Sequence, residues 1–94
     1  MATTILAAGT TAATSSDVTL AVGEAVTLFL TGAGAGTAPA GAACDIEFKR
    51  SDATYTQAYR MAWTGRKQTA RFDGPVTFRI KRPVCAQAVG VDRA

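Results

Sequence analysis

The segment Asp17–Thr31, which reads DVTLAVGEAVTLFLT, decides the fold class. On each side of Gly23-Glu24, apolar residues stand at every second position: Val18, Leu20 and Val22 before it, and Val26, Leu28 and Leu30 after it. Successive side chains of a β-strand point to opposite faces, so this period of two indicates two strands that each bury one face. A glycine between two such runs is typical of a tight turn. The segment therefore predicts a β-hairpin with strands Asp17–Val22 and Ala25–Thr31.

Further short strands are expected along the rest of the chain. They are Cys44–Arg50, Gln68–Phe72, Val76–Arg82 and Val84–Val91, with turn residues such as Asp73-Gly74-Pro75 between them. Thr54–Thr64 has two interpretations. Its alternation puts Tyr55, Gln57, Tyr59, Met61 and Trp63 on one side of a strand, whereas Tyr55, Tyr59 and Ala62 would share one face of a helix. We favour the strand.

Six to eight short strands at intervals of about 8–12 residues are typical of a small sandwich or barrel. We expect an all-β fold, a small antiparallel β-sandwich that is Ig-like or jelly-roll-like. Residues 1–16 are uncharged and rich in Ala, Thr and Ser, and they predict an extended N-terminal arm before a single domain at 17–94. Gly32–Ala43 has four glycines and no bulky side chain, so it predicts a long loop without a core anchor.

The composition argues against an enzyme. The chain has 94 residues, no histidine and two cysteines, Cys44 and Cys85, which are not spaced as a metal-binding or redox pair. The spacing neither requires nor excludes a disulfide. Asp45 and Glu47 share one strand face, where a solvated surface explains them better than paired acid and base catalysis. We expect no catalytic residue, no metal and no cofactor, no export signal or membrane span, and synthesis in a reducing cytoplasm.

The net charge of +3 is unevenly distributed, since all ten basic residues lie at or after Lys49. Arg79 and Lys81 share a strand face, and Arg66 and Lys67 occupy a turn. A solvated β-face explains this row best, an acidic protein partner comes second, and nucleic acid is unlikely because no aromatic side chain shares the face. Tyr55, Tyr59 and Trp63 indicate core packing first and a carbohydrate platform second.

Two stretches carry a resemblance to a known group of proteins. SSDVTLAVGEAVTLFL (residues 15–30) and DGPVTFRIKRP (residues 73–83), separated by a Gly/Ala/Pro loop and a polar alternating strand, resemble small virion proteins of tailed bacteriophages. Within that group the chain is most similar to head decoration proteins, also called cement or auxiliary capsid proteins. The resemblance implies a partner, the major capsid protein together with neighbouring copies of the chain, and a location in the phage head.

Candidate contact residues come from three segments. They are Thr3, Thr4, Ile5 and Leu6 in the arm, Gly34 and Pro39 in the loop, and Arg66, Lys67, Arg79 and Lys81 among the cations. An uncharged arm can add a strand to a partner's sheet edge, and a glycine-rich loop can mould to a surface. The other interpretations are a neck, tail or fibre-attachment protein, an Ig-like carbohydrate- or surface-binding module, and a nucleic-acid-binding barrel.

Overall fold

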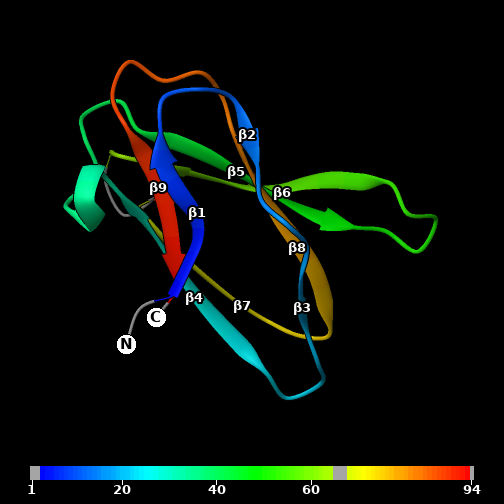
Figure 1. The fold of residues 1–94 in the computed structure, drawn as a ribbon. Helices are drawn as coiled ribbons and strands as arrows, with labels where there is room; N and C mark the ends of the chain where they lie inside the picture. Colours follow the sequence, from blue (N-terminus) through cyan, green and yellow to red (C-terminus); the bar gives the residue numbers. More distant parts are fainter. Residues whose placement is uncertain (1–2, 65–67, 94) are drawn as a thin grey trace.

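The computed structural model of the chain describes residues 3–64 and 68–93, and these form an all-β domain (Figure 1). Its strands are β1 (Thr3–Gly9), β2 (Ala13–Thr14), β3 (Val18–Leu20), β4 (Ala25–Thr31), β5 (Ala43–Lys49), β6 (Tyr55–Ala62), β7 (Thr69–Asp73), β8 (Val76–Arg82) and β9 (Val89–Arg93). One turn of 3-10 helix, η1 (Ala33–Ala35), interrupts the β4–β5 connection, and the described residues contain no α-helix. The predicted all-β class and the strand interpretation of Thr54–Thr64 are confirmed.

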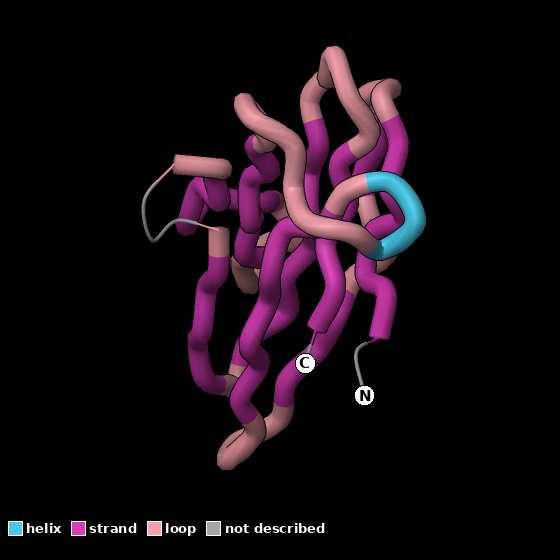
Figure 2. The backbone as a smooth tube through the Cα atoms, turned by 90° about the vertical axis from the view of Figure 1, so that its left-hand side faces the viewer, coloured by secondary structure: helices cyan, strands magenta, loops and turns pink. Residues whose placement is uncertain are grey.

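The strands form two antiparallel sheets that pack face to face. One sheet has the order β1-β9-β4-β7, and the other has the order β2-β8-β5-β6, with β3 also paired to β8. Because β2 and β3 pair with successive parts of β8, they act as one strand interrupted at residues 15–17. Figure 1 shows the two layers from the side of β1 and β3, and Figure 2 looks onto the four-stranded sheet. The predicted small antiparallel sandwich is confirmed.

The strand order is that of a jelly roll. The chain forms a nested antiparallel ribbon in which β1 pairs with β9, β2 and β3 with β8, β4 with β7, and β5 with β6. This ribbon is rolled up so that β4 also pairs with β9 and β5 also pairs with β8. Two such sheets wound from one ribbon define jelly-roll connectivity. The structure therefore favours the jelly-roll alternative over the Ig-like one.

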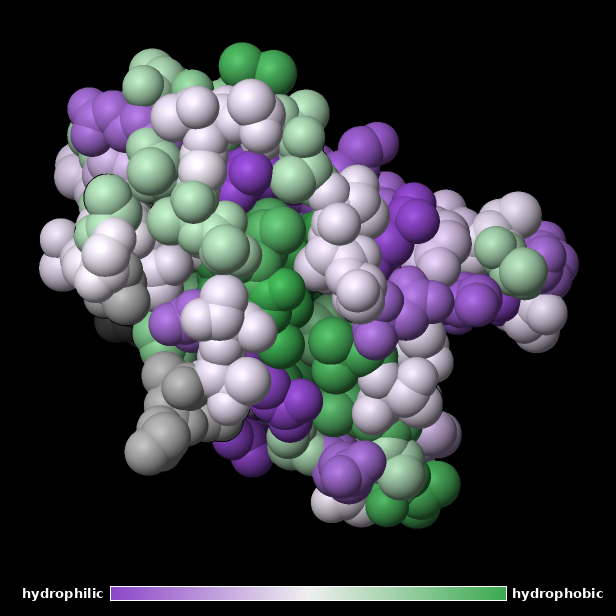
Figure 3. All heavy atoms as spheres, in the orientation of Figure 1, coloured by the Kyte–Doolittle hydropathy of each residue, from purple (hydrophilic) through white to green (hydrophobic). Residues whose placement is uncertain are grey.

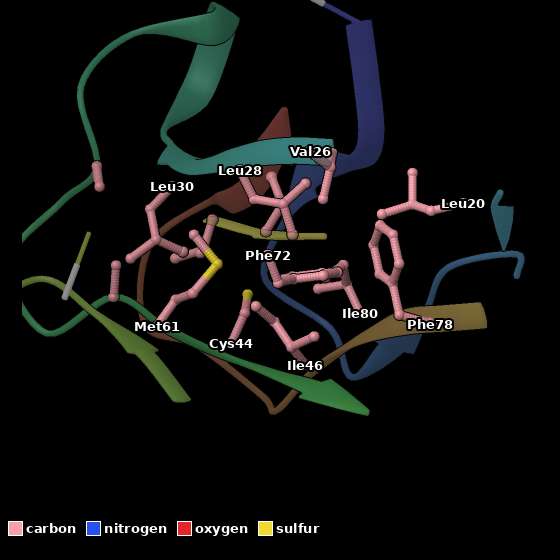
Figure 4. Packing of buried hydrophobic residues seen from close by; sticks show 14 residues of the cluster. Leu20, Val26, Leu28, Leu30, Cys44, Ile46, Met61, Phe72, Phe78 and Ile80 are labelled. Carbon is pink, nitrogen blue, oxygen red and sulfur yellow. The ribbon is translucent and has the colours of Figure 1, made fainter. Parts of the chain in front are cut away.

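The core lies between the sheets and uses the alternating residues. Its largest fully buried side chains are Phe78, Leu28, Ile46, Met61, Ile80, Val89, Val91 and Cys44. Figure 4 shows these layers meeting, with Leu28 and Val26 of β4 above Ile46 and Ile80 of the opposite sheet. Each buried aliphatic side chain of this size contributes about 1.5–3 kcal/mol, so the alternation supplies most of the driving force for folding.

The predicted hairpin between Asp17 and Thr31 is wrong in its pairing. The turn is present, since the Glu24 amide donates to the Ala21 carbonyl at 3.0 Å, and Gly23 has φ of 85°. However, β3 pairs with β8 and β4 pairs with β7 and β9, so the turn carries the chain from one sheet to the other. Val22, expected to point inward, is 82% exposed at this turn. Alternation specifies a buried face, and it cannot distinguish a neighbour in the same sheet from one across the sandwich.

The predicted N-terminal arm is extended, but it does not stand apart from the domain. Within residues 3–16, β1 is an edge strand on β9 and β2 lies on β8. The buried Arg82 side chain holds this segment: its Nε donates to the Thr11 carbonyl at 2.8 Å, and its Nη1 donates to the carbonyls of Ala7 and Val89 at 2.7 and 2.8 Å. Residues 3–16 therefore belong to the sandwich. The distant Arg82 supplies the contact that the local composition lacked.

The Gly32–Ala43 segment is also anchored, contrary to the prediction. Ala38 and Ala42 belong to the buried core, and the Ala42 carbonyl accepts the Trp63 amide at 2.8 Å. Small side chains here fill small spaces at the end of the sandwich, so the lack of bulky residues does not prevent packing. Gly34 keeps a φ of 64°, which a residue with a side chain rarely adopts.

Candidate partner-binding surface

The predicted contact residues lie on different parts of the molecule. Thr3 and Thr4 are exposed on β1, whereas Ile5 and Leu6 are half-buried and pack against the core of their own domain. Gly34 is exposed in η1, which packs beside β1 and β9. Thus β1 and η1 lie next to each other in the sandwich. The apolar side chains of β1, Ile5 and Leu6, already pack against the core of their own domain.

Pro39 lies further along the same connection, half-buried beside the β8–β9 loop. It lines a hollow of about 180 Å³ together with Ala43, Pro83 and Cys85. This hollow is too small for a sizeable ligand, since drug-sized pockets measure about 300–1,000 Å³.

The other two predicted contact residues of this group, Arg66 and Lys67, lie outside the described residues.

Arg79 lies on the outer face of the second sheet and is bound by its own chain. Its Nε donates to Glu47 Oε1 at 2.8 Å, and its guanidinium lies 3.4 Å from the centroid of the Tyr55 ring. The hydrogen bond to Glu47 raises the pKa of Arg79 above its usual value, so the guanidinium stays charged. Lys81 is exposed on the same face, opposite Asp45 in the β5–β8 register.

The rest of this outer face forms a network of paired polar groups. Arg60 Nε donates to Asp45 Oδ1 at 2.9 Å, Tyr55 donates its hydroxyl proton to Asp17 at 2.9 Å, and Lys49 forms an ion pair with Asp17 at 3.5 Å. Figure 3 shows hydrophilic residues gathering over the projecting β5–β6 hairpin. Because opposite charges alternate here, the face offers little net charge to an acidic partner. Of the cations predicted to meet an acidic partner, Arg79 is therefore engaged by a carboxylate of its own domain.

A β-bulge divides the aromatic residues of β6 between two faces. Ile46 pairs with Tyr59 and Glu47 pairs with Gln57, so Ala58 is the extra residue. The bulge reverses the alternation, and Tyr55 points outward while Tyr59 points toward the core side. The predicted single row of aromatic side chains is thus wrong, because no residue pattern marked the bulge.

Tyr59 closes an aromatic cluster that begins inside the core. It stacks on Phe72 with ring centroids 6.0 Å apart and planes at 13°, and Phe48 meets both rings edge-on. Phe72 in turn meets the buried Phe78 at 4.9 Å. Tyr59 remains 47% exposed and Trp63 41% exposed. The aromatic cluster therefore reaches the surface where the edge strands β6 and β7 of the two sheets face each other.

A hollow of about 460 Å³ opens at this side of the sandwich. Tyr59, Arg60, Thr69 and Arg71 are among its lining residues. A second hollow, of about 430 Å³, also includes Thr69 in its lining, together with the C-terminal end of β4 and residues 36–38. No sequence pattern marks this region, because β6 and β7 belong to different sheets and only the topology brings them together.

A further apolar strip lies on the face that Figure 3 shows, between β1 and the strands β3 and β8. The half-buried residues Ile5, Leu6, Val18 and Val76 pack against the core near these edges. This strip is the opposite open side of the sandwich, where the two sheets meet at their other edges.

No metal-binding cluster is present in residues 3–64 and 68–93, where no group of three or more His, Cys, Asp or Glu side chains could hold an ion. Within the same residues, no helix is long and apolar enough to span a membrane. Cys44 is buried, Cys85 is half-buried, and both are free thiols. Comparisons with protein families, curated proteins and solved structures find no match to this chain.

Proposed function

We propose that the chain is a non-enzymatic structural protein of a tailed-phage virion, a decoration protein that binds the outer capsid lattice in many copies and stabilises the head. The resemblance of residues 15–30 and 73–83 to such proteins supports the class of partner. Under this proposal the partners are the major capsid protein and neighbouring copies, with no small-molecule substrate, nucleic acid or membrane. The protein is made in the host cytoplasm and resides in the phage head.

One observation supports binding through the surface more than any other. The β6–β7 side combines an open strand edge, exposed aromatic rings and two hollows, while Arg60 and Arg79 on the β5–β6–β8 face are paired with Asp45 and Glu47 of the same domain. An extended segment that adds to a sheet edge gains affinity from backbone hydrogen bonds, and side-chain hollows beside it give specificity. Aromatic residues are favoured at protein interfaces because they bury a large area and few rotatable bonds are fixed.

The architecture is compatible with this role. Jelly rolls occur in viral capsid domains, and they also occur in lectins and cupins. Fold alone therefore does not choose the function. What favours a structural role is that Arg60 and Arg79 are held by carboxylates of the domain itself, while the β6–β7 side exposes aromatic rings beside a strand edge.

The copy number of the chain in purified virions tests the proposal. Quantitative mass spectrometry against the major capsid protein is expected to give hundreds of copies per particle. A dozen copies or fewer would overturn the decoration role in favour of a neck, tail or fibre-attachment protein. Absence from the particle would overturn every virion role. As an independent test, adding the purified chain to capsids that lack it is expected to raise their thermal stability, and no binding would contradict the proposal.

Carbohydrate binding is the second candidate, because Tyr59 and Trp63 present partly exposed rings on a fold that lectins also use. A glycan array with the wild-type chain and the Trp63→Ala and Tyr59→Ala variants separates the two. Glycan binding that both substitutions abolish would favour this candidate.

A further inference from the structure

The four outer strands of the two sheets differ in regularity. β1 has two register shifts against β9, β6 has the bulge at Ala58, and the β2–β3 edge is interrupted between its two short strands. In contrast, β7 pairs residue for residue with β4, from Ala25 opposite Asp73 to Phe29 opposite Thr69. Bulges and breaks are devices that prevent an edge from pairing with another chain. Among the described strands, β7 is the edge that lacks such a device.

The hydrogen bonds of β4 show which β7 groups are unused by its own sheet. The Leu30 amide donates to the Gln68 carbonyl at 2.9 Å, and the Gly74 amide donates to the Glu24 carbonyl at 2.8 Å. Hydrogen-bonded and non-hydrogen-bonded pairs alternate along an antiparallel ladder. The backbone groups of Thr69, Arg71 and Asp73 therefore point away from β4. All three residues are exposed, and Figure 2 shows β7 at the left margin of the sheet, directly after the grey segment.

We propose that this edge binds a second copy of the chain, with the two β7 strands antiparallel and a two-fold axis at Phe72. In this register Arg71 of each copy lies opposite Asp73 of the other. Both residues present outward backbone groups, so each such pair can exchange two backbone hydrogen bonds. Opposite charges directly across a strand pair stabilise it. The side chains of Arg71 and Asp73 form no ion pair with another described residue.

The charges also select this register over its neighbour. If the axis passed through Arg71, more backbone groups would pair, but Arg71 of one copy would lie directly opposite Arg71 of the other. Like charges directly opposite each other destabilise a strand pair. An axis at Phe72 avoids this contact and brings the two aromatic clusters of the copies next to each other. The result is one continuous sheet across both copies, which a strand edge without bulges permits.

The contact is short, so it is weak in free solution. Interfaces of this size are transient, and we expect a dissociation constant of about 10 μM to 1 mM. The inference does not rest on the virion role. It concerns the isolated chain and is tested without capsids. Where many copies are held near one another, the same contact is strengthened by the high effective concentration.

Charge reversal tests the pairing directly. Sedimentation velocity of the full chain, measured up to about 1 mM, is expected to show a monomer–dimer equilibrium. In Arg71→Asp or Asp73→Arg, both cross-copy pairs become like-charged, and dimerisation is expected to weaken at least about tenfold. The double variant Arg71→Asp/Asp73→Arg restores opposite charges in both pairs and is expected to restore dimerisation to within about threefold of wild type.

The matched control is Lys81→Asp, which makes the same change of charge on the exposed face of the other sheet. It is expected to leave dimerisation unchanged. Circular dichroism of each variant checks that the fold is intact. A chain that stays monomeric at about 1 mM overturns the proposal. So does a dimer that both single reversals leave intact, or one that the double variant fails to restore.

Discussion

The two edges of the four-stranded sheet use arginine in opposite ways. Arg82, 5% exposed, lies beneath the β1 edge and donates to the backbone carbonyls of Ala7, Thr11 and Val89. Arg71 lies on the β7 edge, is exposed, and makes one long hydrogen bond of 3.3 Å to the hydroxyl of Thr27. Arg82 thus binds the β1 edge from the interior, which makes it the closed edge, whereas Arg71 lies at the surface of the β7 edge, which is the open edge.

The difference shows how a small domain can control which of its edges is available. Within the described residues Arg82 forms no ion pair with a carboxylate, so its buried charge is compensated by carbonyl dipoles alone. Such a group costs desolvation energy unless its hydrogen bonds are made, and here one of those bonds, to the Ala7 carbonyl, requires β1 to be in place. The closed edge is therefore tied to the stability of the fold, whereas the open edge is not.

Among the substitutions that test the two edges, Arg82→Ala is expected to have the largest effect on the free energy of unfolding. Three backbone carbonyls, of which that of Val89 belongs to a buried residue, lose their donor, and the free energy of unfolding is expected to fall by about 3–5 kcal/mol, measured by urea denaturation. Hydrogen exchange is expected to accelerate in β1 and to change little in β7. Arg82→Lys keeps the charge but cannot reach all three acceptors, so its free energy of unfolding is expected to lie between those of the wild type and Arg82→Ala. A loss below about 1 kcal/mol would show that Arg82 does not hold the edge.

Gly90→Ala tests the same edge by steric means. A Cβ on Gly90 would lie 2.7 Å from the Leu6 carbonyl oxygen and 2.8 Å from the Ala8 nitrogen, both backbone atoms of β1. The strand must shift, and we expect a loss of about 2–3 kcal/mol in the free energy of unfolding. Gly36→Ala is the control, since its Cβ would meet one carbonyl oxygen at 3.2 Å. Equal losses in both variants would mean that close packing of β1 on β9 is unimportant.

The sequence predicts the strands of this fold much better than their partners. The alternation around Gly23 identifies β3, β4 and the turn between them, because burying one face of a strand leaves a period of two. It fails on pairing, since β3 and β4 bury the same kind of face whether they are neighbours or lie across the core. The jelly-roll order depends on which distant strands meet, and no local pattern encodes it.

The candidate surface was harder to predict for the same reason. Tyr59 was on the correct strand, but the bulge at Ala58 sends it to the opposite face from Tyr55. Arg79 was correctly placed on an outer face, while its ion pair with Glu47 depends on the β5–β8 register. Residues 1–16 looked like an arm because Arg82, which holds them, is far away in the sequence. In each case the missing information was a long-range contact.

The buried thiol of Cys44 lies close enough to Cys85 and Arg82 for both to act on it electrostatically. Burial, followed by the nearby Cys85, raises the pKa of Cys44 from 9.0 to about 12. Between these pH values the unfolded chain releases a proton that the folded chain keeps. The contribution of this thiol to the free energy of unfolding is therefore fully present below pH 9 and is lost as the pH rises toward 12. At pH 10 we expect a loss of about 1 kcal/mol from this group.

Urea denaturation at pH 8 and pH 10 measures this loss, and the Cys44→Ala variant serves as the control. Other groups that titrate in this range are common to both chains, so the wild type should lose more stability between the two pH values. Parallel losses would mean that the Cys44 thiol is accessible to water in the folded state. In Arg82→Lys, faster alkylation of Cys44 than in wild type would show that loosening the closed edge opens the core beneath it.

Arg71→Ala is expected to have the smallest effect on the stability of the monomer. The substitution removes one long hydrogen bond to Thr27 on an exposed face. Because the Arg71 side chain is exposed, its loss leaves no cavity in the core. At concentrations where the chain is monomeric, we expect the free energy of unfolding to change by less than about 0.5 kcal/mol. A change as large as that of Arg82→Ala would mean that both edges are structural and that β7 is not held open for a partner. A neutral result combined with weaker dimerisation would instead separate the two arginines by role, because a residue that is dispensable to its own fold but required by a second copy acts only across the edge.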